Sequence, residues 1–186
     1  MNVPLLKIID KNNQLPSTFA QFMDWKSGDG HKYEWNDGEL IKFSGMNKTQ
    51  FHIYSLLNRL FISKGYWEKG TFVAKQDVQL SGIQMRRPDI AYFSIEQEMS
   101  MKNGNDEIPA FVMEVISGND NINQVEEKII EYFKATVKVV WLILPESNCV
   151  HVYTSRKDVK ICTDADLCSA VPVLPNFEIS VNTLFS

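Results

Sequence analysis

Residues 110–144, AFVMEVISGNDNINQVEEKIIEYFKATVKVVWLIL, contain two apolar runs separated by an amphipathic segment. The runs AFVMEVI at 110–116 and VKVVWLIL at 137–144 are short and largely apolar, which is typical of central strands covered on both faces. Between them, residues 121–135 carry apolar residues at helical spacing, at Ile122, Val125, Ile129, Tyr132 and Phe133. We therefore predict a buried strand, an amphipathic helix and a second buried strand.

The sequence before this unit adds further elements. IAYF at 90–93 is another short apolar run typical of a central strand, whereas residues 95–109 have the composition of a polar loop. Residues 66–80 fit one bent strand or two short ones. Asn47 precedes a helical run whose predicted core-facing stripe is Phe51, Ile53, Leu56, Leu57, Leu60 and Phe61, and Gln50 stands where a capping-box partner belongs.

The two ends of the chain are predicted to add peripheral structure. Residues 17–26 form a short helix, and Asp37-Gly38 supplies the tight turn of a hairpin within 33–45. VHVYTS and DVKICT form an edge hairpin at 150–163, and the tail packs onto the sheet as a short helix or an extended segment. The predicted fold is α/β, a mixed sheet flanked by helices with an extra N-terminal hairpin and a C-terminal edge hairpin, in a single domain spanning residues 1–186.

Composition limits the class of protein. Hydrophobic residues make up 44% of the chain and charged residues 23%, and no stretch approaches the roughly 18 uninterrupted apolar residues of a membrane span. Residues 1–16 lack a basic start and a cleavage site, so we expect a soluble cytoplasmic protein without export. The three cysteines show no C-x-x-C spacing, which favours buried thiols over a disulfide framework or a zinc cluster. The net charge of -4 argues against tight non-specific DNA binding, although an acidic metal site would contribute to that total.

Asp89 and Glu114 are the candidates for chemistry. Asp89 stands at the start of one apolar strand and Glu114 interrupts another, and a carboxylate is costly to bury without a partner. If the two strands are neighbours, both carboxylates could point to one place, where Mg²⁺ (or Mn²⁺) would supply the missing partner through oxygen ligands. The alternative is that Glu114 bonds to backbone groups or pairs with an arginine.

Lys128 lies about two turns into the helix that follows the Glu114 strand, roughly 9 Å along its axis. A lysine side chain that points back toward the helix N-terminus can cover much of that distance. The alternative for Lys128 is a solvated surface charge, which is the common meaning of a lysine on a helix.

A family resemblance joins these positions. Four motifs resemble those of the Uma-two family of restriction endonucleases, a branch of the PD-(D/E)XK nuclease superfamily. They are RPD at 87–89, VMEVIS at 112–117, K-x-x-x-Y at 128–132 and V-x-x-x-W-L-I-x-P at 137–145. YEWNDGEL at 33–40, His52 and the closing VLPNFEISVNTLF also resemble that family, so the likeness covers nearly the whole chain. It implies a restriction-endonuclease-like αβββαβ core, with Asp89 and Glu114 as metal ligands and Lys128 as the lysine. In the superfamily the lysine usually lies two residues after the acidic residue, and here that position is Ile116. The family that the chain resembles has its lysine on the following helix instead, and Lys128 matches that position better than Lys134 does.

The function that follows is a Mg²⁺-dependent DNA endonuclease that hydrolyses phosphodiester bonds. Asp89, Glu114 and the backbone carbonyl of Val115 would hold the ion, and Lys128 would orient the attacking water or neutralise transition-state charge. Glu39 is a further candidate ligand, with an exposed edge-strand carboxylate as the equal alternative, and Gln124 could also face the site. The alternative function is a catalytically inactive binding or interaction protein on the same fold. We expect DNA as the partner and a homodimer, for which the exposed hairpin at 149–163 could pair between chains.

Overall fold

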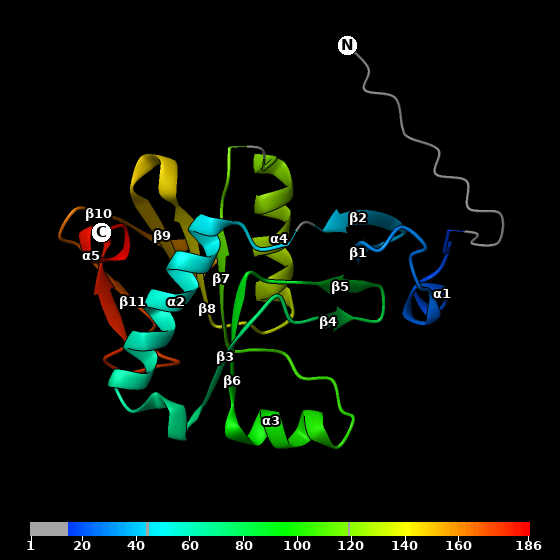
Figure 1. Ribbon diagram of the computed structural model, residues 1–186, viewed down its shortest axis with the longest axis horizontal. Helices are drawn as coiled ribbons and strands as arrows, with labels where there is room; N and C mark the ends of the chain where they lie inside the picture. The colour runs from blue at the N-terminus through cyan, green and yellow to red at the C-terminus, as the bar shows by residue number, and fades with distance from the viewer. Residues whose placement is uncertain (1–14, 44, 119) are drawn as a thin grey trace, which may run out of the picture.

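A six-stranded mixed sheet lies at the centre of the molecule, with strand order β10-β9-β8-β7-β6-β3 (Figure 1). The computed structural model describes residues 15–43, 45–118 and 120–186. The strands of this sheet are β3 (Gly70–Ala74), β6 (Ile90–Ser94), β7 (Phe111–Val115), β8 (Val139–Leu144), β9 (Cys149–Ser155) and β10 (Asp158–Thr163). Strands β7 and β8 run parallel and the other neighbours run antiparallel. The parallel pair is joined by α4 (Ile122–Lys134), as the sequence predicted.

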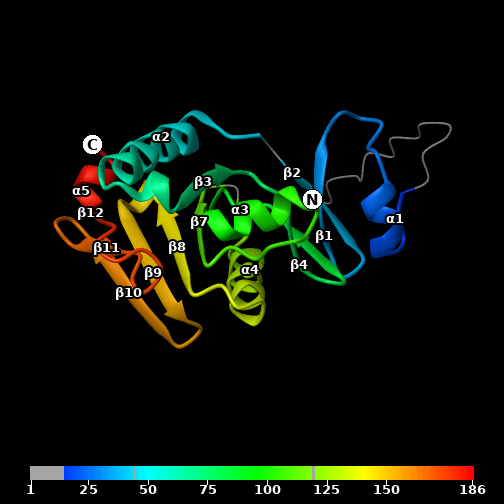
Figure 2. The ribbon, with the colours of Figure 1, turned by 90° about the horizontal axis from the view of Figure 1, so that it is seen from below.

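Two helices cover the opposite faces of this sheet (Figure 2). Helix α2 (Lys48–Ser63) packs on the face that contains Phe111, Met113 and Val115 of β7. Helix α4 packs on the other face, together with Val112 of β7 and Val140 of β8. Because successive side chains of a strand point to opposite faces, Glu114 lies on the α4 face. The order α2, β3, β6, β7, α4, β8 confirms the αβββαβ core.

A second sheet extends from one end of the core, with strand order β2-β1-β5-β4 (Figure 1). It consists of the predicted hairpin β1 (Lys32–Asn36) and β2 (Glu39–Phe43), joined by β5 (Gln84–Arg86) and β4 (Val78–Ser81). Helix α1 (Phe19–Asp24) packs on it through Phe22, which contacts a small core of Trp35 and Met85. The stretch 66–80 therefore holds two strands, and they belong to different sheets. Strand β5 and the second sheet were not predicted.

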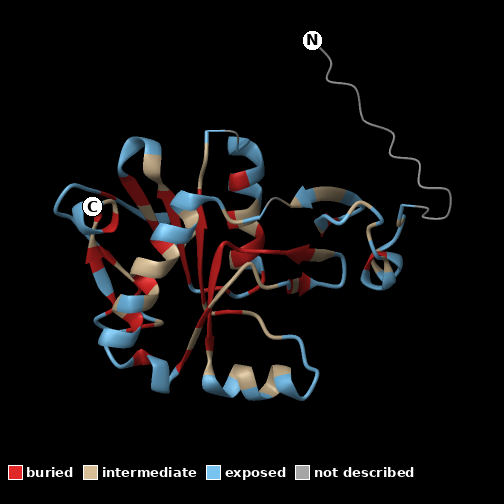
Figure 3. Cartoon of the chain, in the orientation of Figure 1, coloured by how far each residue is buried: buried red, intermediate tan, exposed pale blue. Residues whose placement is uncertain are grey.

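The remaining elements complete the edges. The predicted edge hairpin is β9 and β10, and β10 forms the sheet edge. The tail contributes β11 (Leu167–Ser169), β12 (Glu178–Ser180) and α5 (Val181–Leu184), and two 3-10 turns lie at Tyr66–Glu68 and Pro145–Ser147. Figure 3 shows that the inner strands β6, β7 and β8 of the central sheet are buried, whereas the outer faces of the helices are exposed.

Two sequence predictions about local structure are wrong. Residues 95–102 are not loop but helix α3 (Ile95–Lys102), whose N-terminus is stabilised by a capping box between Ser94 and Gln97. This helix has no fully buried residue, so it lacks the apolar stripe from which a helix is recognised. Phe51 and Ile122 do not join the core stripes of their helices, since they are 61% and 63% exposed. Each lies in the first turn of its helix.

Among the described residues, no helix has the length and apolar character needed to cross a membrane. The N-terminal stretch in which we expected no export signal falls mainly in residues 1–14, outside the described part of the chain. Cys149, Cys162 and Cys168 are buried, as predicted.

Candidate active site

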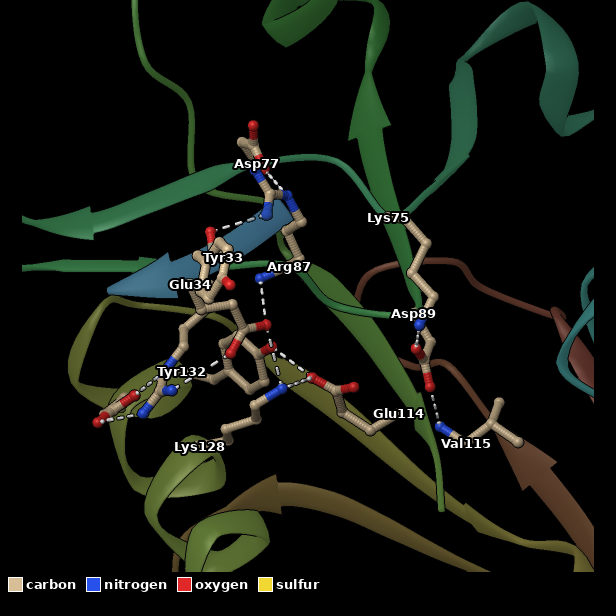
Figure 4. Close-up of polar contacts among 12 residues, drawn as sticks. Tyr33, Glu34, Lys75, Asp77, Arg87, Asp89, Glu114, Val115, Lys128 and Tyr132 are labelled. Carbon is tan, nitrogen blue, oxygen red and sulfur yellow. Dashed lines mark hydrogen bonds and ion pairs between the residues drawn. The ribbon is translucent and has the colours of Figure 1, made fainter. Parts of the chain in front are cut away.

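Three strands bring Lys75, Asp89 and Glu114 into one row. Ile90 pairs with Met113 across β6 and β7, and Ala74 pairs with Ile90 across β3 and β6. One step further along these antiparallel registers, Lys75 lies opposite Asp89 and Asp89 lies opposite Glu114. The three residues lie at the same end of the sheet, and all three line one cavity. Strands β6 and β7 are neighbours, and Asp89 and Glu114 lie near each other at the ends of these strands (Figure 4), while their role as metal ligands stays a prediction.

Glu114 is a buried carboxylate with two polar partners. The hydroxyl of Tyr132 donates to its Oε1 at 2.5 Å, and Lys128 Nζ lies 3.7 Å from the same oxygen. Its side chain is only 8% exposed. Burial raises the pKa of Glu114 to about 7, against the lowering effect of the Lys128 charge and with a further increase from the nearby Asp89 charge. The raised pKa therefore reflects mainly the removal of the Glu114 carboxylate from water.

Asp89 has a partner at each carboxylate oxygen. The backbone N–H of Val115 donates to Oδ2 at 2.7 Å, and the Gln50 amide donates to the same oxygen at 3.1 Å. Oδ1 forms an ion pair with Lys75 Nζ (Figure 4). The Gln50 amide also lies 3.4 Å from the carbonyl oxygen of Val115, so α2 contributes a side chain to the end of β7.

Lys128 points into the site from α4. Its Nζ lies 3.3 Å from Glu34 Oε1 and 3.7 Å from Glu114 Oε1. Burial opposes the charged form of Lys128, but the carboxylates of Glu114 and Glu34 outweigh it and raise the pKa of Lys128 above its usual value. Lys128 is therefore a fixed ammonium group between two carboxylates, which excludes the alternative of a fully solvated surface lysine.

A buried network under the site fixes Glu34. Its Oε1 accepts the backbone N–H of Arg87 at 2.9 Å, and its Oε2 lies 3.3 Å from Arg86 Nη1. Arg86 in turn donates hydrogen bonds from Nε and Nη2 to Glu131 of α4, at 2.7 and 3.0 Å. Arg86 is 1% exposed, and this paired geometry matches the fork of a guanidinium to a carboxylate. The network ties the N-terminal hairpin to α4 and so sets the position of Lys128.

The site opens into a cavity of about 310 Å³. Its walls come from β2 and the segment leading into α2, from the ends of β3, β6 and β7, and from the first turns of α4. The predicted residues among its lining are Asp89, Glu114, Val115, Lys128, Glu39 and Gln124. Glu39 begins β2 and is exposed, as is Gln124 on α4, so their parts in the site stay predictions.

The donor set fits a small hard cation. Among the described residues, no three His, Cys, Asp or Glu side chains form a ready-made metal cage. Two carboxylates and one backbone carbonyl nevertheless face a cavity with room for water. Mg²⁺ is commonly held by one or two carboxylates, with waters and substrate oxygens as the other ligands. The raised pKa of Glu114 fits the same conclusion, because an added cation would favour its ionised form.

Sequence reasoning did not assign several residues of this site. Lys75 was not among the predicted site residues, and Gln50 was expected only as the capping partner of a helix. Gln50 does form the capping box with Asn47, but its amide also reaches Asp89. Glu34 and Glu131 carried no role at all. The available signal for Glu131 was a charged residue between the apolar positions Ile129, Tyr132 and Phe133 of the helix.

Comparison with known proteins gives two matches. The family model Uma2, described as "Putative restriction endonuclease", matches residues 19–182. A crystal structure from Anabaena variabilis, of a protein described as a "putative nuclease", superposes with a TM-score of 0.72. That structure is 20% identical in sequence, and the alignment covers 91% of this chain and 98% of the other, so it supports the shared fold. Among curated proteins, none matches the chain.

Proposed function

The chain belongs to the Uma2 restriction endonuclease family, and from this premise we propose that it is a metal-dependent endonuclease that hydrolyses phosphodiester bonds of DNA. The observation that carries the proposal is the row of Asp89 and Glu114 on adjacent strands, with Lys128 beside Glu114 at the wall of one cavity.

Asp89, Glu114 and the Val115 carbonyl would hold Mg²⁺ or Mn²⁺, and Glu39 at the cavity wall is a further candidate. When bound, such an ion would lower the pKa of a water molecule and stabilise charge on the phosphate. The protein's part is to keep these oxygens in place. Val115 N–H and the Gln50 amide hold Asp89, and the Tyr132 hydroxyl holds Glu114.

Lys128 supplies a permanent positive charge at the site. Because its pKa is raised, it stays an ammonium donor at neutral pH and does not act as a base. Its role is to orient the attacking water or to stabilise negative charge that develops on the phosphate, which preorganised donors do well in a partly buried site. Glu34 acts through Lys128 and is a positioning residue.

We also propose that two copies act together on a duplex. The support is the edge strand β10, where Val159 and Ile161 are 43% and 58% exposed beside unpaired backbone. An exposed strand edge of this kind can pair with a second copy. Sedimentation or light scattering would give the mass in solution, and a monomer at all concentrations would contradict this part of the proposal.

The test of the proposed activity is cleavage of supercoiled plasmid DNA with Mg²⁺ or Mn²⁺. The variants Asp89→Asn, Glu114→Gln and Lys128→Met should each lose at least about a hundredfold in rate, the scale of a lost charge-stabilising group. The matched control is Glu178→Gln on β12, an exposed acid that should cut like the parent, and EDTA should stop cleavage. Parental rates in Asp89→Asn and Glu114→Gln would refute the assignment.

A second candidate is a binding protein on the same fold that does not cut. Two observations favour it, since Ile116 occupies the superfamily's usual lysine position and Lys75 already neutralises Asp89. Retention of labelled DNA by the parent without any metal-dependent cleavage would support this candidate over the nuclease.

A further inference from the structure

Lys75 is held in place by its backbone and by its side chain. It follows β3 with φ at +58°, a left-handed conformation that is uncommon for a residue with a side chain. Its backbone N–H donates to the carbonyl oxygen of Asp89 at 3.2 Å, which continues the β3–β6 ladder by one step. The side chain is only 16% exposed. Lys75 is therefore a fixed part of the cavity wall.

The Lys75 ammonium has a defined location between Asp89 and Phe43. Nζ pairs with Asp89 Oδ1 and lies 4.5 Å from the centre of the Phe43 ring. A cation over an aromatic face is stabilised by the ring, more so when it is partly withdrawn from water. Both neighbours line the cavity that contains Glu114 and Lys128.

The two oxygens of Asp89 are used differently. Oδ2 faces protein N–H donors, from Val115 and Gln50, which fix the orientation of the carboxylate. Oδ1 pairs with the ammonium group of Lys75, which also lines the cavity. The oxygen left for a metal ion is thus the oxygen that a protein cation already occupies.

We propose that Lys75 stands in for the divalent ion at Asp89 in the metal-free protein, and that the ammonium and the ion compete for Oδ1. This inference rests on the proposed metal-dependent function, but it concerns the affinity of the site and not the cleavage step. A structural tie between β3 and β6 does not require the side chain, because the backbone bond from Lys75 to Asp89 already provides it. The consequence is a site that stays paired until a divalent ion is abundant enough to replace the ammonium.

The test is titration of Mn²⁺ alone into the metal-free protein, followed by calorimetry. Lys75→Met should bind Mn²⁺ at least about tenfold more tightly than the parent, a difference of about 1.4 kcal/mol. Lys75→Gln removes the charge but keeps an amide donor, and it should also bind more tightly. The matched control is Lys42→Met, which removes a positive charge from the same cavity wall without touching Asp89. Asp89→Asn should abolish binding in each background.

The outcomes separate this inference from the proposed function. If the parent binds Mn²⁺ through Asp89 but both Lys75 variants bind no more tightly than Lys42→Met, the inference is wrong and the metal site stands. Weaker binding in folded Lys75 variants, checked by urea unfolding, would also overturn it, since Lys75 would then support the site. If no protein binds Mn²⁺ in a way that depends on Asp89, both are wrong.

Discussion

The charge on Glu114 should make the metal-free protein less stable, so Glu114→Gln should stabilise it at pH 8. Glutamine has nearly the same shape, and its carbonyl oxygen can still accept the Tyr132 hydroxyl. It resembles the protonated form that burial favours. Lys128 keeps a carboxylate partner, because Glu34 remains 3.3 Å away.

The size of the effect follows from the two pKa values of Glu114, 4.5 in the unfolded chain and about 7 in the folded protein. Below pH 4.5 both states are protonated and the group has no effect on stability. Between pH 4.5 and 7 the unfolded chain releases the proton while the folded protein keeps it, so stability falls as the pH rises. Above pH 7 the full loss is present, about 3 kcal/mol at about 1.4 kcal/mol for each pKa unit.

Urea unfolding of the metal-free protein at pH 8 and pH 5 measures this difference. The gain of Glu114→Gln over the parent should approach 3 kcal/mol at pH 8 and shrink toward zero near pH 4.5. The matched contrast is Glu131→Gln, which removes a buried carboxylate bound to Arg86 and should destabilise the protein. Mg²⁺ should stabilise the parent more than Glu114→Gln. A variant less stable than the parent at pH 8, or a difference that does not change with pH, would refute the reasoning.

Three further substitutions test the framework of the site by urea unfolding. Arg86→Met leaves Glu34 and Glu131 buried without their partner and should cost about 3–5 kcal/mol; a loss under 1 kcal/mol would contradict the network. Gly70→Ala should cost about 3 kcal/mol, because its Cβ would lie 2.1 Å from a backbone oxygen, whereas Gly82→Ala, with open space, should stay within about 0.5 kcal/mol. Ser94→Ala should cost about 1 kcal/mol through the lost α3 cap, and no change would argue against that cap.

The central fold was predictable because its strands and helices have strong, simple patterns. The apolar runs at 90–93, 110–116 and 137–144 have few alternatives to burial on both faces, and α4 has an apolar stripe from Val125 to Phe133. Strand β5 was not predicted because it has only three residues and one of them is an arginine. Arg86 can be buried only because Glu131, far away in the sequence, pairs with it. Helix α3 was not predicted because it has no apolar stripe, and its capping box is the main sequence signal for it.

The candidate site was predictable only where sequence-local rules apply. A carboxylate inside an apolar run marks Glu114, and the strand start marks Asp89. Three other residues reach the site from segments that are separated from these two acids in the sequence. No local pattern distinguishes Gln50 from a helix cap, Glu34 from an ordinary strand residue, or Lys75 from a surface lysine. Only the register of β3, β6 and β7 and the packing of the hairpin against α4 bring them together.

The charges of the buried cluster bear on how a net acidic chain would accept the polyanionic substrate that we propose. Four carboxylates, those of Glu34, Asp89, Glu114 and Glu131, face the three cations Lys75, Arg86 and Lys128. One negative charge of this cluster is therefore uncompensated, and burial is the main cause of the raised pKa of Glu114. A divalent ion would turn the excess of one negative charge into an excess of one positive charge, at the place where the proposed function requires a phosphate to bind. Under the proposed function, the acidic cluster would be needed to bind the cation, and the bound cation would make the local electrostatic potential favourable for DNA.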